Sequence, residues 1–540
     1  MQPRRPNILF ILADDLGQGD VSCFNPGAAW TTPHLDRLAA EGMRFTDSHA
    51  TSSLCTPSRY AALTGRYNWR SRLKRSVLPG DSEALIEKGR LTLPGFLGEH
   101  GYRTAVVGKW HLGLDWQLTP GDNALRQAAT DLGEPPLPQQ RMGRGGNFDA
   151  EYLYRAEGLD IDYAKPVTFG PREVGFDYSF ITAASLDQPP YVYLENGQAQ
   201  QVPSKIGGDY SPLNRRTAEH QQSIQRGPMA EGYDVHRVAP DFQAKAVDVL
   251  DGFLAGEDPW FLYVPSHLVH GPIIPNEPWQ GRSGQGPYGD FVLQFDEYVG
   301  QLVERIDAAG AGEDTIIILT SDNGASGVAD LPRLSGVGHD SSNGWRGKKS
   351  DIWEGGHREP TIVRWPGTID AGVVSAETVS HSDLFATVAE VLGAPVPDTA
   401  AEDSISNLPL WTGSQEPVRT DLVSSSGGGG FAIRRGDWKL EFVTTGDGMD
   451  QRFAETQGET PTEYRAAQLY HLGQDPAEQH NRFEDEPEVV RELTELLSSH
   501  IRRGRSTPGP DQPNHSNAPS RQWRQIGWMA DAETVVERCL

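Results

Sequence analysis

The chain of 540 residues is poor in cysteine, in long apolar runs and in positive charge. Its three cysteines, Cys23, Cys55 and Cys539, cannot form a disulfide scaffold, and their spacing does not match a zinc finger. No apolar run approaches the roughly 18 residues that span a bilayer, so we expect no membrane insertion. The chain has 48 Lys and Arg against 74 Asp and Glu, a formal net charge of −26. This charge repels nucleic-acid backbones, so we expect no nucleic-acid partner.

The N-terminal residues show no recognisable signal peptide. The apolar run after Asn7 is short and ends at Asp14 and Asp15, which is typical of a buried strand. If a leader has been removed from a longer precursor, the protein is expected to be periplasmic or secreted, and otherwise cytoplasmic. The compartment therefore stays open at this point.

Several apolar runs end in polar residues of similar kinds. The runs are residues 7–13, 104–107, 260–264 and 315–320, and they lead to Asp14-Asp15, Lys109 and His111, Ser266-His267, and Asp322-Asn323. Unbroken apolar runs fit strands that are buried on both faces, as in a mostly parallel sheet covered by helices. Ligands of such sheets bind beyond the carboxyl ends of the strands. The pattern predicts one composite site.

Apolar residues spaced three to four apart predict helices between these strands. We expect helices at residues 32–40, 240–254, 290–309 and 381–392. The polar stretch 121–232 has little periodicity and predicts a long loop region that builds a substrate pocket. Four glycines at 427–430 predict a flexible loop. Residues 185–188, His339 and Asp340 are further candidates for facing a substrate.

The composition changes after about residue 412. Short strands are expected at 431–435, 438–443 and 468–472, and an amphipathic helix at 486–502. These elements predict an α+β domain over residues 413–503, after a large α/β domain over residues 1–412. Residues 504–540 are predicted to be a tail that begins with a proline-rich, linker-like segment.

The segment 54–65 is the most informative part of the sequence. Pro57 and Gly65 bracket a short helix and place Cys55 at its N-terminus, which carries partial positive charge and favours an anion. Arg59 lies one turn further along, within reach of the same anion. A lone cysteine before a proline is more often a buried thiol.

The whole string Cys55-Thr56-Pro57-Ser58-Arg59, followed by Thr64-Gly65, resembles the type I sulfatase signature. Blocks similar to the rest of that family stand in the same order, at Asp14-Asp15, 108–113, Asp322-Asn323-Gly324, 354–358 and 469–478. Five blocks in series make coincidence implausible. The resemblance covers residues 6–481. It implies an alkaline phosphatase-like α/β fold, with a large mixed, mostly parallel sheet between helical layers and a smaller C-terminal α+β domain.

The first and third of these blocks predict a metal site. Asp14, Asp15, Asp322 and Asn323 offer hard oxygen donors, which suit calcium or magnesium and disfavour zinc or copper. Adjacent aspartates after a strand are by default a solvated turn. The resemblance implies calcium, with magnesium the less expected ion, and a further oxygen ligand from residue 55. Without the ion the acids would nearly cancel the local positive charge, so we expect chelation to abolish activity.

The resemblance also implies a nucleophile. In this family the cysteine, here Cys55, is oxidised to formylglycine by a formylglycine-generating enzyme, and the hydrated aldehyde attacks sulfur. Arg59 and Lys109 are assigned to the sulfate oxygens. His111 is assigned to the formylglycine hydroxyl, a task that suits an imidazole because it removes a proton near neutral pH.

Two pairs of neighbours compete for the remaining roles. The family's histidine stands two residues before a proline, which selects His270 over His267. Its lysine stands five residues before Glu354, which selects Lys349 over Lys348. The resemblance implies that His270, helped by Lys349, binds the substrate and protonates the departing alcohol oxygen.

The resemblance therefore implies an enzyme, a sulfuric ester hydrolase that acts on a sulfated small molecule or oligosaccharide. Aromatic residues such as Trp110, Trp116, Tyr191 and Trp345 suggest a sugar, because sugar rings stack on aromatic faces. One alternative is a phosphonate monoester or phosphodiester hydrolase of the same superfamily. The other is a protein that binds sulfated sugars without cutting them.

Overall fold

The structure is a computed structural model that describes residues 5–119, 121, 123–131, 158–209, 223–448 and 467–515. Within these residues, ten strands form one sheet in the order β13-β2-β12-β11-β1-β10-β4-β5-β6-β7. The strands are β1 (Asn7–Ala13), β2 (Met43–Phe45), β4 (Arg103–Lys109), β5 (Tyr178–Thr182), β6 (Leu194–Glu195), β7 (Gln198–Ala199), β10 (Trp260–Pro265), β11 (Thr315–Ser321), β12 (Thr361–Arg364) and β13 (Val373–Ser375). Strands β11, β1, β10, β4 and β5 run parallel, whereas β12 is antiparallel to both its neighbours. The predicted mixed, mostly parallel sheet is confirmed.

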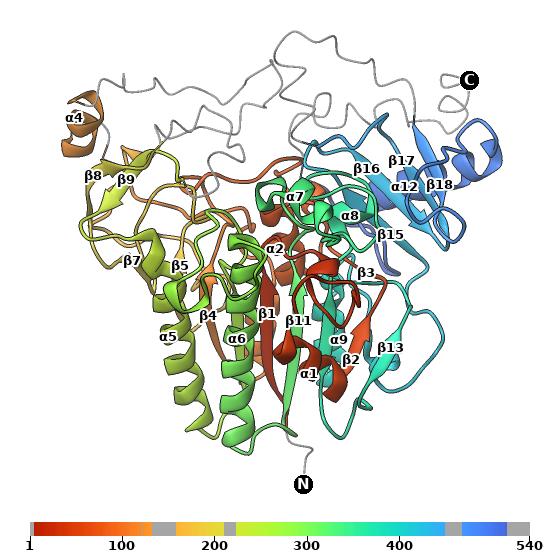
Figure 1. Cartoon of the computed structure of the whole chain (residues 1–540), viewed down its shortest axis with the longest axis horizontal. Coiled ribbons are helices and arrows are strands. Elements are labelled where there is room, and N and C mark those ends of the chain that lie inside the picture. The colour runs from red at the N-terminus through yellow and green to blue at the C-terminus, as the bar shows by residue number, and fades with distance from the viewer. Residues whose placement is uncertain are drawn as a thin grey trace.

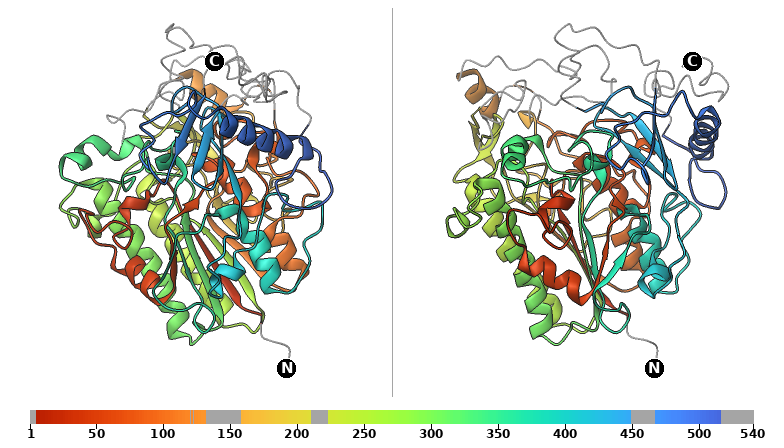
Figure 2. Two further views of the ribbon diagram at one scale, coloured as in Figure 1. Left: turned by 90° about the vertical axis from the view of Figure 1, so that its right-hand side faces the viewer. Right: turned by 45° about the vertical axis from the view of Figure 1, so that its right-hand side comes forward.

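Helices cover both faces of this sheet (Figures 1 and 2). One face carries α1 (Pro33–Glu41), α5 (Val235–Leu254) and α6 (Pro287–Ala308), which pack on Leu9 and Ile11 of β1. The other face carries α2 (Cys55–Thr64), α3 (Leu93–Glu99), α9 (Leu384–Val391) and α10 (Leu408–Trp411), which pack on Ile8 and Phe10. Since alternate residues of β1 enter two separate cores, the strand has to be apolar throughout.

Some helix limits differ from the prediction. α5 begins five residues before Pro240, because the side chain of Asp234 accepts a hydrogen bond from the backbone N–H of His236 (3.0 Å) and caps the helix there. Similarly, α6 begins at Pro287 rather than 290. The predicted helix 381–392 is divided into a 3₁₀ turn, His381–Asp383, and α9.

The stretch predicted as one long loop contributes strands instead. β5 extends the main sheet by pairing in parallel with β4, and β8 (Pro203–Gly207) pairs with β9 (Gly227–Ala230). The sequence of β5 is rich in aromatic and β-branched residues, a signal that a count of periodicity over a longer window hides. α4 (Ala124–Asp131) belongs to the same stretch. Residues 132–157 and 210–222 lie outside the described residues.

The C-terminal part forms a separate four-stranded antiparallel sheet, at the upper right of Figure 1. Its strands are β15 (Asp421–Ser425), β16 (Phe431–Arg435), β17 (Trp438–Glu441) and β18 (Gln468–His471), and α12 (Pro487–Arg503) packs on it. The predicted α+β unit is confirmed, while its limits at 413 and 503 stay a prediction. Tyr67 and Trp69 of the large domain enter the core of this sheet, so the two parts share apolar packing.

Residues 504–515 lie against the large domain. Arg66 donates to the carbonyl oxygen of Pro513 (2.8 Å) and Arg70 to Oδ1 of Asn514 (3.2 Å). The remaining short elements include β3 (Ser48–His49), β14 (Val379–Ser380), α7 (Leu331–Gly336) and α8 (Glu354–His357). Among the described residues, none of the helices combines the length and apolar character needed to cross a membrane.

Candidate active site

Several strand ends converge at the upper edge of the main sheet in Figure 1, close to the start of α2. Asp14 and Asp15 follow β1, and Asp322 follows the neighbouring β11. The backbone N–H of Asp322 donates to the carbonyl oxygen of Ala13 (3.1 Å), which keeps the two strands in register up to the acids. Lys109 ends β4. The structure brings these strand ends together as the sequence predicts.

Two of the acids form buried ion pairs. Arg59 donates from Nε and Nη2 to Oδ2 of Asp322, at 3.0 and 2.7 Å, and Nζ of Lys109 lies 2.7 Å from Oδ2 of Asp14. Burial favours a high pKa for Asp322, but the charges of Arg59 and Lys109 outweigh it and hold the pKa below its usual value. Burial raises the pKa of Asp14 to about 7 although Lys109 opposes it. Asp14 therefore needs a further positive neighbour to be fully ionised at neutral pH.

Cys55 is the first residue of α2, and its side chain faces the same cluster. Its sulfur lies 3.6 Å from Oδ1 of Asp14 and 3.5 Å from Nζ of Lys349, and the residue is 1% exposed. Lys349 also donates to Oδ1 of Asp15. Burial, reinforced by Asp322, raises the pKa of the Cys55 thiol to about 12. An unmodified Cys55 is therefore a protonated thiol at neutral pH and a weak nucleophile.

Polar oxygen atoms without partners occur in this cluster. Oδ2 of Asp15 and Oδ1 of Asn323 are buried and make no hydrogen bond within the described part of the chain. Ligand atoms of Asp14, Asp15, Cys55 and His270 all lie within 4.8 Å of one another. Buried polar atoms are almost always paired with protein, water or an ion, so the cluster fits a bound cation.

Asp322 stands slightly apart from that tight group. Arg59 holds its Oδ2, and the backbone N–H of Asp15 donates to its Oδ1 (3.2 Å). Asn323 contacts the group directly, because its side-chain amide donates to Oδ1 of Asp15 (2.7 Å).

His111 is arranged as a neutral base. Its Nε2 lies 2.9 Å from the carbonyl oxygen of Leu78, which only accepts, so Nε2 carries the hydrogen. Nδ1 is then bare, and it has no hydrogen-bond partner among the described residues. Burial, with the charges of Lys109 and Arg59, holds the pKa of His111 well below its usual value.

His270 lies at the same site, whereas His267 lies in the core. Nε2 of His270 is 3.7 Å from Oδ2 of Asp15, and its Nδ1 donates to the carbonyl oxygen of Gly271 (2.5 Å). Nε2 is therefore the atom through which His270 takes or gives a proton. His267 is paired instead with Oγ1 of Thr182 (2.8 Å).

Asp187 is a site residue that the spacing of the sequence did not single out. Its Oδ1 lies 3.9 Å from Nδ1 of His270. It follows β5 by five residues, so recognition of that strand, with the rule that sites lie beyond strand ends, would have found it. His339 and Asp340, the other candidates, do not reach the cluster: His339 is buried against Asp20 (2.9 Å), and Asp340 accepts from backbone N–H groups of its own loop.

Family models decide the identity. The model described as Sulfatase matches residues 6–394, and the one described as the C-terminal region of aryl-sulfatase matches residues 426–532. The chain belongs to the sulfatase family. The roles that the family resemblance implies for individual residues stay predictions, and the geometry described above supports them.

Named sulfatases align with this sulfatase over most of its length. An N-acetylgalactosamine-6-O-sulfatase of Bacteroides thetaiotaomicron is 33% identical over 525 residues, covering 92% of this chain and 93% of that protein. Human arylsulfatase A is 31% identical over 508 residues, covering 91% and 87%. A solved structure from work on glycosaminoglycan metabolism by Bacteroides thetaiotaomicron has a TM-score of 0.73 and 32% identity, covering 92% of this chain and 99% of that one. This sulfatase is therefore an enzyme that hydrolyses sulfate esters.

Two of the aromatic residues named from the sequence are buried and cannot form a sugar platform in this sulfatase. Trp110 and Tyr191 are 2% and 1% exposed and belong to the apolar cores. Trp345 is covered by the guanidinium of Arg358, 3.7 Å from the ring centroid. That prediction is wrong for Trp110 and Tyr191, because composition gives no information on burial. Trp345 is half-buried, so for this residue it stays a prediction.

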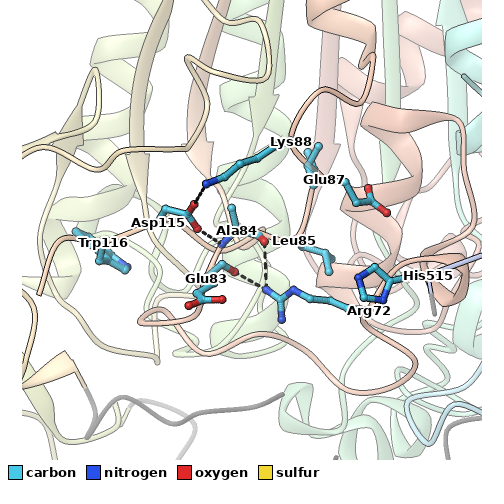
Figure 3. A pocket seen from close by; sticks show the side chains of 10 residues that line it. Arg72, Glu83, Ala84, Leu85, Glu87, Lys88, Asp115, Trp116 and His515 are labelled. Atoms are coloured by element: carbon cyan, nitrogen blue, oxygen red, sulfur yellow. Dashed lines mark hydrogen bonds and ion pairs between the residues drawn. The ribbon is translucent and has the colours of Figure 1, made fainter. Parts of the chain in front are cut away.

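A pocket of about 550 Å³ is lined by residues other than the clustered acids Asp14, Asp15 and Asp322 (Figure 3). Its lining includes Arg72, Lys88, Asp115 and Trp116, and none of the predicted site residues. Arg72 donates to the carbonyl oxygen of Ala84 (3.2 Å), and Lys88 pairs with Asp115 (2.9 Å). The pocket contains none of the clustered acids, histidines and lysines of the candidate site, so no role in the reaction is assigned to it.

Proposed function

We propose that this sulfatase removes a sulfate ester from a carbohydrate, with a formylglycine made from Cys55 and a bound calcium ion. A single observation carries the proposal: the side chain of residue 55 lies between the acid Asp14 and the ammonium of Lys349, 3.6 and 3.5 Å away. The 33% identical relative, an N-acetylgalactosamine-6-O-sulfatase, supports the 6-sulfate of N-acetylgalactosamine as the first substrate to test.

The residues present fit a hard cation. Asp14, Asp15, Asp322 and Asn323 would hold it through oxygen atoms, which calcium and magnesium prefer. Lys109, Lys349 and Arg59 balance the three carboxylates in its absence. A bound calcium would supply a Lewis acid that polarises the nucleophile and the sulfate oxygens.

A formylglycine at position 55 would supply a geminal diol, with one hydroxyl to attack and a second to restore the aldehyde. The free thiol of Cys55 is a weak nucleophile, because burial keeps it protonated, and it carries no second hydroxyl through which the sulfate could be expelled. A formylglycine-generating enzyme would carry out the maturation. The N-terminus of α2 favours the negative charge that develops beside residue 55.

Basic side chains hold the sulfate group. Nζ atoms of Lys109 and Lys349 converge on the space around residue 55, so both can donate to sulfate oxygens. Arg59 is fixed by Asp322 and by the carbonyl oxygen of Lys109 (3.1 Å). Because these donors are already in place, they stabilise developing charge with little reorganisation.

Two histidines handle protons at opposite steps. Nε2 of His270 would release a proton to the departing alcohol oxygen, and this atom lies at the cluster, 3.7 Å from Oδ2 of Asp15. Nδ1 of His111 would accept a proton from the diol, since it is bare and the lowered pKa keeps the imidazole unprotonated before this step. The acid and the base are thus separate residues.

The test is free sulfate released from mono-sulfated hexose and hexosamine regioisomers, with Cys55→Ala measured in parallel. We expect release from N-acetylgalactosamine 6-sulfate and none from the variant. A phenyl phosphonate monoester is the comparison substrate, and faster cleavage of that ester than of every sulfate would overturn the proposal. Removal of the metal by a chelator should abolish activity, and calcium should restore it more fully than magnesium.

A further inference from the structure

The four glycines at 427–430 form the loop between β15 and β16, and this loop is buried rather than flexible. Asp447 braces it by accepting hydrogen bonds from the hydroxyl of Ser426 (2.5 Å) and the N–H of Gly430 (2.9 Å). The prediction of a flexible loop is therefore wrong. Glycine is required here for close packing, since a Cβ at Gly428 would lie 2.2 Å from Oδ2 of Asp447.

The loop joins two segments of the large domain that carry site residues. The carbonyl oxygen of Ser425 accepts from the N–H of Ser53 (2.9 Å), two residues before Cys55. The N–H of Gly427 donates to the carbonyl oxygen of Ser350 (2.8 Å), the residue after Lys349. The small C-terminal sheet thus contacts the backbone beside both Cys55 and Lys349.

Ser350 has a left-handed backbone conformation, with φ of +74°. A non-glycine residue in this region is strained and persists only when its surroundings hold it. Hydrogen bonds hold it on both sides: its N–H donates to the carbonyl oxygen of Ser53 (2.8 Å), and its carbonyl oxygen accepts from Gly427. This turn fixes the direction in which Lys349 leaves the backbone.

Position 427 has no room for a side chain. A Cβ there would lie 2.8 Å from Cβ of Ser350 and 3.1 Å from Cδ1 of Leu54, the residue before Cys55. Contacts under 3.0 Å between such atoms force a shift. The atom that must move belongs to the strained turn beside Lys349.

From this geometry we infer that Gly427, supplied by the C-terminal sheet, is a positioning residue that sets Lys349 against residue 55 through Ser350. The inference rests on the proposed function, in which Lys349 binds the sulfate group. It assigns the smaller domain a part in shaping the active site, through the backbone beside Lys349. Gly427 contacts Ser350 through its backbone, and this close approach is possible because glycine has no side chain.

The kinetic test uses Gly427→Ala. We expect kcat to fall about 10- to 100-fold with a smaller change in KM, because small misplacements of catalytic groups are costly. Gly473→Ala is the matched control: its Cβ would lie 2.6 Å from Oδ2 of Asp437, in the same domain but away from Ser350. We expect this control to keep the wild-type kcat.

Rescue separates positioning from a general loss of folding. Ser350→Gly removes the clashing Cβ and tolerates a positive φ, so kcat of Gly427→Ala/Ser350→Gly should return to that of Ser350→Gly alone. A Gly427→Ala variant as fast as the wild type overturns the inference. The inference is also overturned if kcat of Gly427→Ala/Ser350→Gly stays as low as that of Gly427→Ala.

A second readout does not depend on sulfatase activity. In protein produced without the maturation enzyme, iodoacetamide labelling of Cys55 can be followed by the mass of the tryptic peptide 45–59. We expect labelling to be about tenfold faster in Gly427→Ala, because the shift loosens the packing around the buried sulfur. Equal labelling rates contradict the inference. A wild type that releases no sulfate from any substrate contradicts the proposed function, while this labelling still tests Gly427.

Discussion

The ammonium nitrogen of Lys349 lies 3.5 Å from the sulfur of Cys55 and also donates to Asp15. The ammonium nitrogen of Lys348, the preceding residue, lies 3.5 Å from Oδ2 of Asp351, and its side chain is 31% exposed. Two successive lysines therefore face different surroundings. They form a matched pair for testing whether charge at the cluster is needed for catalysis.

Lys349→Ala should lower kcat/KM at least about 100-fold, because it removes a fixed donor from the sulfate group. Lys348→Ala should stay within about twofold of the wild type, as expected for a surface substitution. Initial rates on the best sulfate ester of the panel measure both. Equal losses in the two variants would show that Lys349 has no special part.

His270→Ala should affect substrates according to their leaving groups. We expect a loss of about 100-fold or more in kcat for a sugar sulfate, whose alcohol needs a proton to depart. The loss in kcat of His270→Ala should be much smaller for an aryl sulfate with an acidic phenol, because a phenolate departs without a proton. His267→Ala removes a core contact with Thr182 and should lower thermal stability while leaving the ratio of the two rates unchanged. A His270→Ala enzyme with the same loss on both substrates would contradict the proton role.

The folded protein should become less stable as the pH is lowered below 6.5, because of His381. Burial lowers the pKa of this residue to about 4, and it accepts a hydrogen bond from the N–H of Thr51 (3.3 Å). Below its usual pKa of 6.5 the unfolded chain binds a proton that the folded chain does not. The free energy of unfolding should therefore decrease by up to about 3 kcal/mol between pH 6.5 and 4 on account of this group.

His381→Gln removes that contribution. We would measure the free energy of unfolding with denaturant at a series of pH values. Between pH 6.5 and 4 it should change less with pH in the variant than in the wild type. Parallel curves would mean that His381 does not stay neutral in the folded protein.

Lys439 holds three buried acids together where the C-terminal sheet meets the large domain. Its Nζ lies 2.8 Å from Glu478 and 3.1 Å from both Glu354 and Glu441. Lys439→Met should lower the free energy of unfolding by about 3–5 kcal/mol, because it leaves buried carboxylates without their cation. Lys88→Met, at an exposed ion pair with Asp115, should leave the unfolding midpoint nearly unchanged. Similar unfolding midpoints for the two variants would contradict this.

The sequence predicts the centre of this protein well. Apolar strands such as β1 and β11 are specified by burial on both faces, and the acids after them mark the site because parallel strands end at one edge. The resemblance to the sulfatase family, which places a histidine two residues before a proline and a lysine five before Glu354, selected His270 and Lys349. The structure places both residues at the cluster.

Features that depend on packing between distant segments were missed. The glycine loop looks flexible because glycine is permissive, yet Ser350 and Asp447 make it a close-packed contact. Trp110 and Tyr191 suit a sugar platform by type but face the cores. In each case the deciding partner lies far away in the sequence, so no local pattern could report it.

The central claim is that the nucleophile is an aldehyde derived from Cys55. The most direct measurement is the mass of the tryptic peptide 45–59 from a preparation that releases sulfate. The account predicts that the peptide carries an aldehyde at position 55 and that activity rises in proportion to the converted fraction. Full activity in a preparation whose peptide carries only the thiol would contradict it.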